Sequence, residues 1–148
     1  MRKLIGSLAT LSAVAGALLA TTGPASAASG CGGSGGVHTE EPYGFEYGST
    51  NCSVYSTGNV MADGAVSGFL HAGTNWFVCQ EQFTDRPNPA VGTARNNWWL
   101  YTQADTGSAP LHGWGWFPAT RVSGGGNFEP IPGLIGCGHF PIIPVASP

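Results

Sequence analysis

Asn97-Trp98-Trp99-Leu100-Tyr101-Thr102 is the stretch that most clearly predicts a β-strand, because aromatic residues dominate it and they favour extended backbone. Neighbouring side chains of a strand point to opposite faces of the sheet. Trp98 and Trp99 are therefore both buried only if both faces of this sheet are covered. The stretch predicts a β-sheet with aromatic rings on two faces.

Four further stretches have the composition of strands and are separated by residues that favour turns. They are residues 52–56, 65–70, 75–82 and 113–122, the last as a strand pair or as a strand with a short turn, and Gly58-Asn59 and Asp63-Gly64 are expected turns. Two prolines place residues 84–89 in a loop, and residues 103–112 are expected to form another. No stretch after residue 27 shows helical periodicity with capping residues. The chain therefore predicts an all-β fold, a small barrel or sandwich, with almost no α-helix.

Residues 1–27 have the features of a secretory signal peptide. Arg2 and Lys3 supply positive charge, residues 4–20 are apolar, and Ala25-Ser26-Ala27 supplies the small residues that signal peptidase requires. We expect cleavage after Ala27 and a secreted product. A membrane anchor is the alternative, but the apolar run is short and rich in small residues.

Removal of residues 1–27 leaves an acidic chain. Three basic residues stand against eight acidic ones, so the formal net charge is about −5. Nucleic acids and anionic membranes bind basic surfaces, so we expect neither as a partner. No later run is long and apolar enough to predict a membrane span.

Four cysteines, Cys31, Cys52, Cys79 and Cys137, follow the predicted signal peptide. An even number in an exported chain predicts two disulfides, with three possible pairings. A zinc site is one alternative, although no two cysteines have the C-x-x-C spacing of metal knuckles. A lipid anchor on Cys31 is another, because residues 28–31 loosely match a lipobox. Lipidation would leave an odd number of cysteines.

Composition divides the remaining chain into an arm, a domain and a tail. Residues 28–50 form a Gly-rich N-terminal arm, which we expect to be mobile over residues 28–37 except where Cys31 ties it down. Its later part, residues 38–51, forms an edge strand or lies extended on the domain. Residues 51–123 form the β-domain, and residues 124–148 form an irregular Gly/Pro-rich tail that Cys137 pins back.

Several short motifs occur in an order that resembles a bacterial SH3-like domain. They are Gly64-x-Val66-x-Gly68-x-Leu70-x-x-Gly73, Cys79-Gln80, Asn97-Trp98-Trp99 and Gly115-Trp116-Phe117 with Val122 after it. Residues 122–134 and the final cysteine are similar to the small secreted SH3-like proteins of actinobacteria. The resemblance covers roughly residues 50–137.

The resemblance implies a small SH3-like barrel of five to six short strands. The even number of cysteines adds disulfide staples to this expectation, and the composition adds irregular arms at both ends. Together with proximity in the chain, the resemblance implies the pairings Cys79–Cys137 and Cys31–Cys52. It implies binding and no catalysis, because such domains often hold cell-wall peptides or glycans. Peptidoglycan is therefore the expected partner, with another extracellular protein as the alternative.

No motif predicts catalysis. Residues 32–36 satisfy G-x-S-x-G but lie in a glycine-rich segment with no strand before them or helix after them. Glu81 and Asp85 are conceivable paired carboxylates, but no further residue orients them. Four single histidines lack metal-ligand spacing: His38, His71, His112 and His139. We therefore expect no enzyme activity, no cofactor and no metal.

Aromatic side chains are the stronger signal of function. The core of so small a domain cannot hold all of the aromatic rings in its last strands. These rings are Trp98, Trp99, Tyr101, Trp114, Trp116 and Phe117. Either the surplus rings pack beneath the tail or the arm, or they form an exposed platform beside residues 103–112 that stacks on sugars or peptides. Trp114, between two glycines, is the most exposed candidate.

Acidic side chains add a second candidate feature. Asp63, Asp85 and Asp105 either recognise cationic groups of wall peptides or are ordinary solvated turn residues. Pro141-Ile142-Ile143-Pro144 spells P-x-x-P and either docks on an aromatic groove or is an unstructured tail.

A secreted, non-catalytic binding module for cell-wall peptide or glycan is the first functional expectation. One alternative is a secreted protein–protein interaction or protease-inhibitor-like protein that presents residues 84–95 or 103–112. The other is a structural surface component.

Overall fold

The computed structural model describes residues 30–41, 43–140 and 148, and these residues form an all-β fold, as predicted. The described strands are β1 (Cys31–Glu40), β2 (Phe45–Val54), β3 (Gly58–Ala62), β4 (Ala65–Leu70), β5 (Gly73–Phe77), β6 (Cys79–Gln82), β7 (Trp98–Gln103), β8 (Thr106–Gly107) and β9 (Trp114–Pro118). Two short 3-10 helices, η1 (Ala119–Arg121) and η2 (Cys137–His139), are the helices of this part of the chain. The predicted signal peptide and the P-x-x-P segment lie outside the described residues.

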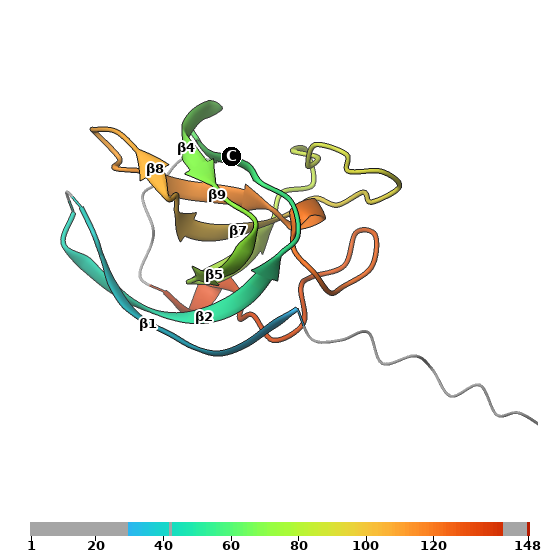
Figure 1. The fold of residues 1–148 in the computed structure, drawn as a ribbon, viewed down its shortest axis with the longest axis horizontal. Coiled ribbons are helices and arrows are strands. Elements are labelled where there is room, and N and C mark those ends of the chain that lie inside the picture. The colour runs from blue at the N-terminus through green and yellow to red at the C-terminus, as the bar shows by residue number, and fades with distance from the viewer. Residues whose placement is uncertain (1–29, 42, 141–147) are drawn as a thin grey trace, which may run out of the picture.

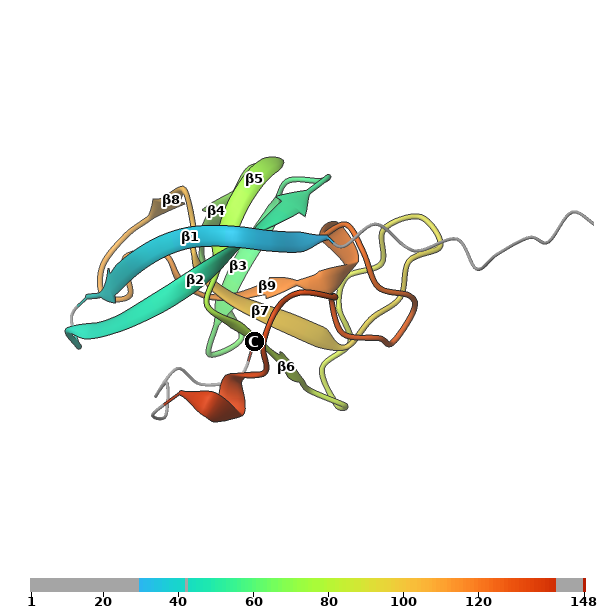
Figure 2. The same cartoon turned by 90° about the horizontal axis from the view of Figure 1, so that it is seen from below.

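The strands form two antiparallel sheets, which Figures 1 and 2 show from two directions. One sheet has the order β1-β2-β5, and the other has the order β6-β7-β9-β3-β4-β8. The long β1–β2 hairpin curves around one side of the molecule (Figure 1). The loop of residues 83–97 lies at the opposite end from β8 in both views.

The predicted strand over residues 75–82 is divided at Val78 and serves both sheets. Phe77 pairs with Thr50 of β2, whereas Cys79 pairs with Tyr101 of β7. The chain therefore leaves the first sheet and enters the second within two residues. Periodicity could not reveal this break, because the backbone is extended on both sides of it.

The N-terminal arm is regular, so the prediction of an irregular, mobile segment is wrong from Cys31 onward. β1 pairs with β2 along its length, from Cys31 opposite Cys52 to Glu40 opposite Phe45. Register shifts between Cys31 and Gly36 mark β-bulges, and Gly36 has φ +94°, which favours glycine. The glycines thus allow the strand to bend around the domain.

The edge-strand alternative for residues 38–51 is correct only for residues 38–40, which end the edge strand β1, because residues 45–51 belong to β2, the central strand of that sheet. β2 crosses the predicted domain boundary at residue 51, so the hairpin is part of the β-structure. The predicted turn at Gly58-Asn59 begins β3, and the predicted loop over residues 103–112 contains β8. The described part of the chain therefore holds nine strands, more than the five to six expected.

Core residues lie on both faces of β7 and β9. Leu100 and Phe117 belong to one buried cluster, which Trp98 also contacts. Trp99 and Trp116 belong to a second, more aromatic cluster. The two neighbouring tryptophans thus point to opposite faces, as the alternation of a strand requires. Both faces of the sheet are covered.

The surplus rings pack beneath the hairpin and the tail. Tyr47 of β2 belongs to the aromatic cluster, and Phe140 of the tail packs against it. The ring centroids of Tyr47 and Phe140 are 5.8 Å apart. The covered alternative is therefore correct for most of the predicted aromatic residues.

The two disulfides have the expected pairings. Cys31 is bonded to Cys52, and Cys79 is bonded to Cys137. The alternatives of a zinc site and of a lipid on Cys31 are therefore wrong, since every cysteine sulfur is in a disulfide. Two disulfides indicate that the chain folds in an oxidising environment.

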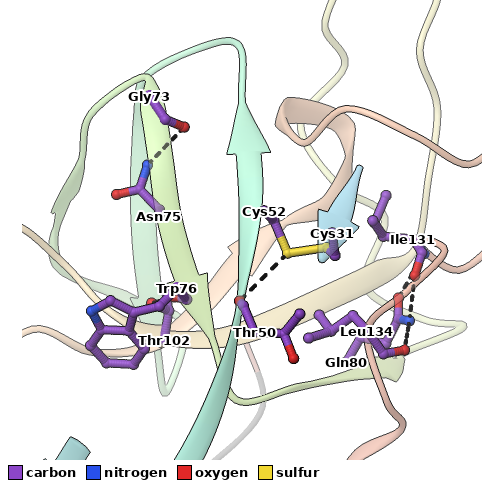
Figure 3. The surroundings of a disulfide bond; sticks show 10 residues. All are labelled: Cys31, Thr50, Cys52, Gly73, Asn75, Trp76, Gln80, Thr102, Ile131 and Leu134. Carbon is purple, nitrogen blue, oxygen red and sulfur yellow. Dashed lines mark hydrogen bonds between the residues drawn. A yellow bond between two sulfur atoms is a disulfide. The ribbon is translucent and has the colours of Figure 1, made fainter. Parts of the chain in front are cut away.

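Over residues 124–140 the tail is irregular but pinned, as predicted, and Gln80 adds to the restraint of the disulfide. The Gln80 side-chain amide donates hydrogen bonds to the carbonyls of Ile131 (2.9 Å) and Leu134 (2.7 Å), and its oxygen accepts one from the Ile131 N–H at 2.7 Å. Figure 3 shows these contacts beside the Cys31–Cys52 bond. Adjacent residues of β6, Cys79 and Gln80, thus hold the tail against the domain.

Candidate functional site

A groove of about 460 Å³ lies along β3, which provides three of its lining residues, Gly58, Asn59 and Met61. Asn59 and Met61 are two residues apart and therefore face the same side of the sheet. Phe69 of β4 stands opposite Asn59 in the strand pair and lines the groove from one side. The volume lies in the range of about 300–1,000 Å³ that is usual for small-ligand sites.

The other side of the groove is formed by Trp99, Pro118 and Pro89. Trp99 of β7 and Pro118 of β9 are cross-strand partners. Hydrogen bonds hold the loop that carries Pro89: the Thr120 hydroxyl donates to the Pro89 carbonyl at 2.8 Å, and the Trp99 indole donates to the Arg86 carbonyl at 2.8 Å. This wall is therefore preformed.

Phe69 is the exposed ring of the groove. Its side chain is 49% exposed, whereas Trp99 is 5% exposed and presents little of its surface. An aromatic ring on a concave surface stacks on the apolar face of a sugar or on a peptide side chain. Thr57, Asn59 and Arg121 place polar groups around it.

A second pocket, of about 320 Å³, lies between Tyr55, Arg95 and the turn at residues 124–126. Arg95 Nη1 donates to the carbonyls of Gly92 (2.9 Å) and Ala94 (2.8 Å), and the Tyr55 hydroxyl donates to the Thr120 carbonyl. The groove along β3 is the larger of the two and is the stronger candidate for a ligand site.

The structure brings one predicted site residue, Trp99, into the groove. Trp114 is fully buried, so the prediction that it is the most exposed ring is wrong. Its flanking glycines do not expose it, because Trp76 and Tyr47 pack against it with ring centroids 5.4 and 6.1 Å away. The remaining predicted rings do not line the groove: Tyr101, Trp116 and Phe117 are buried, and Trp98 is half-buried against the core.

The predicted acidic residues lie in exposed positions outside the groove. Asp63 occupies the β3–β4 turn with φ +52°. Asp105 accepts hydrogen bonds from the backbone N–H of His71 at 2.7 Å and pairs with its Nδ1 at 2.9 Å. Asp85 lies 3.6 Å from Arg86 Nε. The geometry supports the solvated-turn alternative for these carboxylates.

Sequence reasoning missed Phe69, Met61, Asn59, Pro89, Pro118 and Arg121 as groove residues. A signal for Phe69 was present, since it lies between Gly68 and Leu70 in a predicted strand. Both neighbours are buried, so alternation turns Phe69 outward. The prolines carried no such signal, because their role depends on how the 83–97 loop meets β9.

Glu40 forms a buried polar centre that the sequence also did not reveal. Its carboxylate is 0% exposed and accepts hydrogen bonds from the hydroxyls of Tyr47 (3.0 Å) and Tyr101 (2.5 Å). Burial and the nearby Glu40 carboxylate hold the pKa of both tyrosines well above the ordinary value of 10.0. None of the three residues lines the groove.

Alkaline pH is expected to destabilise the fold through Tyr47 and Tyr101. Both phenols ionise near pH 10 in the unfolded chain but resist ionisation in the folded one. Their stabilising contribution is therefore complete below about pH 10 and falls as the pH rises above it. We expect the urea midpoint, followed by tryptophan fluorescence, to fall between about pH 10 and pH 11.5.

Tyr47→Phe provides the control, since it removes one of the two resistant groups and should make this decline shallower. A urea midpoint that stays constant up to about pH 11.5 would contradict the assignment.

No group of three or more His, Cys, Asp or Glu side chains in the described ranges is placed to hold a metal ion. Within the same residues, no helix has the length and apolar character needed to cross a membrane.

Comparison with known proteins found no matching family model, no matching curated protein and no matching solved structure.

Proposed function

We propose that this protein is an exported, non-catalytic binding module of the SH3-like type, which holds cell-wall peptide or glycan in the groove along β3. The observation that carries the proposal is Phe69, a half-exposed ring on a preformed concave surface. The disulfides and the signal-like N-terminus support export. The order of the SH3-like motifs supports wall material as the ligand.

The lining of the groove favours binding over catalysis. Its described residues supply an aromatic ring, aliphatic surface, an amide, a hydroxyl and a guanidinium. They include no histidine, cysteine or carboxylate, the side chains that most often act as nucleophile or general base. The groove is therefore suited to hold a ligand by stacking and hydrogen bonding.

Replacing Phe69 with alanine is expected to weaken binding to purified peptidoglycan about tenfold, because it removes the stacking surface. Binding is measured by co-sedimentation of the oxidised protein with insoluble peptidoglycan over a range of protein concentrations. The effect on folding should be small, since Phe69 is not in either core cluster.

Phe128→Ala is the matched control. Phe128 is 58% exposed, comparable to Phe69, but does not line the groove, so this variant should bind like the wild type. Equal loss in both variants would point to non-specific apolar adhesion. No sedimentation of the wild type would contradict wall binding itself.

The loop of residues 83–97 favours a second candidate function, that of a protease-inhibitor-like protein. The loop protrudes from one end of the molecule (Figure 1) and is internally ordered. Asn88 N–H donates to the Asn96 carbonyl at 2.8 Å, and Asn88 Oδ1 accepts from the Thr120 N–H at 3.1 Å. A rigid, exposed loop is what an enzyme cleft accepts at low entropic cost. Failure of the wild type to bind wall material would favour this candidate.

A further inference from the structure

We infer that the ligand of the groove carries a free carboxylate and that Arg121 binds it, which makes the ligand class a short peptide or glycopeptide with an anionic end. The inference rests on the proposed function and specifies its chemistry.

Arg121 is held in place by its neighbours. Its Nη1 donates to the Ser56 hydroxyl at 2.7 Å and to the Thr57 carbonyl at 2.6 Å. Its side chain lies against Gly58, where a Cβ would come within 2.5 Å of Arg121 Cδ. Only glycine leaves room for the arginine at that position. A guanidinium fixed in this way loses little conformational freedom when an anion binds.

Arg121 has no anionic partner among the described residues. The other two arginines of this part of the chain do not line the groove, and Arg86 lies beside Asp85. No acidic side chain lines the groove. A guanidinium forms strong, paired hydrogen bonds with a carboxylate, so the groove is complementary to one.

The acidic character of the chain bears on how selectively the Arg121 guanidinium binds a carboxylate. The chain carries eight acidic residues, but salt screens the field of charges beyond about 8–10 Å. A carboxylate in contact with Arg121 gains a short-range attraction that few other places on the surface offer. Arg121 therefore determines where, and in which orientation, an anionic ligand binds.

The length of the groove indicates a ligand of a few residues. Gly58, beside Arg121, and Met61 are three residues apart on β3, which corresponds to roughly 10 Å. A terminal carboxylate at Arg121 thus leaves space for about two further residues over Phe69 and Met61. Asn59 lies between these positions and offers an amide to the ligand backbone.

Two forms of one ligand test the inference without any mutation. Soluble peptide-bearing fragments of peptidoglycan are compared with the same fragments after their carboxyl groups have been converted to amides. Isothermal titration calorimetry of the oxidised protein should show that the amidated fragments bind about tenfold more weakly than the fragments with free carboxyl groups. Equal affinity for both forms would overturn the carboxylate assignment and leave the proposed function standing. Absence of binding to either form would contradict the proposed function as well.

Three variants assign the effect to Arg121. Arg121→Gln should bind both forms of the fragments equally and weakly, and Arg121→Lys should keep part of the preference, since it retains the charge but loses the planar fork. Arg95→Gln, which removes an arginine outside the groove, should behave like the wild type. Thermal unfolding confirms that each variant is folded. A preference for the free carboxylate that persists in Arg121→Gln would overturn the assignment.

Discussion

Replacing Glu40 with alanine is expected to lower the free energy of unfolding by about 3 kcal/mol. The change leaves the buried hydroxyls of Tyr47 and Tyr101 without their acceptor, at a cost of about 1–3 kcal/mol each. The expected loss is smaller than the sum of these two costs at their upper values, because burial of the Glu40 carboxylate already destabilises the wild type by its desolvation. Urea unfolding followed by circular dichroism and tryptophan fluorescence measures the effect.

Glu41→Ala is a closely matched control, since Glu41 is the next residue and is exposed. Its effect is expected to stay within about 0.5 kcal/mol. Glu40→Gln should fall between the two, because an amide accepts from one tyrosine hydroxyl and donates to the other. Similar values for Glu40→Ala and Glu41→Ala would show that the buried centre does not stabilise the fold.

Removing the Cys79–Cys137 disulfide, by alanine at both positions, is expected to lower the free energy of unfolding by about 4 kcal/mol. The bond joins residues 58 apart in sequence and therefore restricts the unfolded chain strongly. It also holds the tail where Gln80 binds Ile131 and Leu134, so its loss weakens those hydrogen bonds too. Urea unfolding in the absence of reductant measures the change.

The Cys31–Cys52 disulfide is the internal comparison. It joins residues 21 apart, so the double alanine variant is expected to lose about 3 kcal/mol, less than the first pair. Peptide mass mapping of unreduced digests should find both pairings in the wild type. If the Cys31–Cys52 variant loses more free energy of unfolding than the Cys79–Cys137 variant, the bond that pins the tail does not stabilise the domain as proposed.

Local patterns predicted part of the fold closely. The stretch at residues 65–70 coincides with β4, and the aromatic stretch at residues 97–102 lies within one residue of β7 at each end. Alternation and β-propensity are properties of the chain over a few residues, so a single sequence displays them. The glycine-rich β1 carries no such pattern, because its extended conformation comes from pairing with β2.

The candidate site was less predictable, because exposure depends on distant contacts. Trp114 is covered by Tyr47, which precedes it by many residues, and by Trp76 of another strand. Phe69 is half-exposed and belongs to neither buried cluster of the described residues. Neither outcome follows from the residues beside these rings. The tertiary arrangement of hairpin and tail selects which aromatic side chain is offered to a ligand.

The amino-acid sequence alone determined the all-β class, the presence of two disulfides and the opposite orientations of Trp98 and Trp99. Composition and the two-residue period of a strand are enough for these conclusions. Only the tertiary structure decided that the N-terminal glycines form a strand, that Glu40 is buried between two tyrosines, and that the groove is lined by Phe69 and Arg121. Burial and groove formation result from contacts between residues far apart in the chain, and a local pattern contains no information on such contacts.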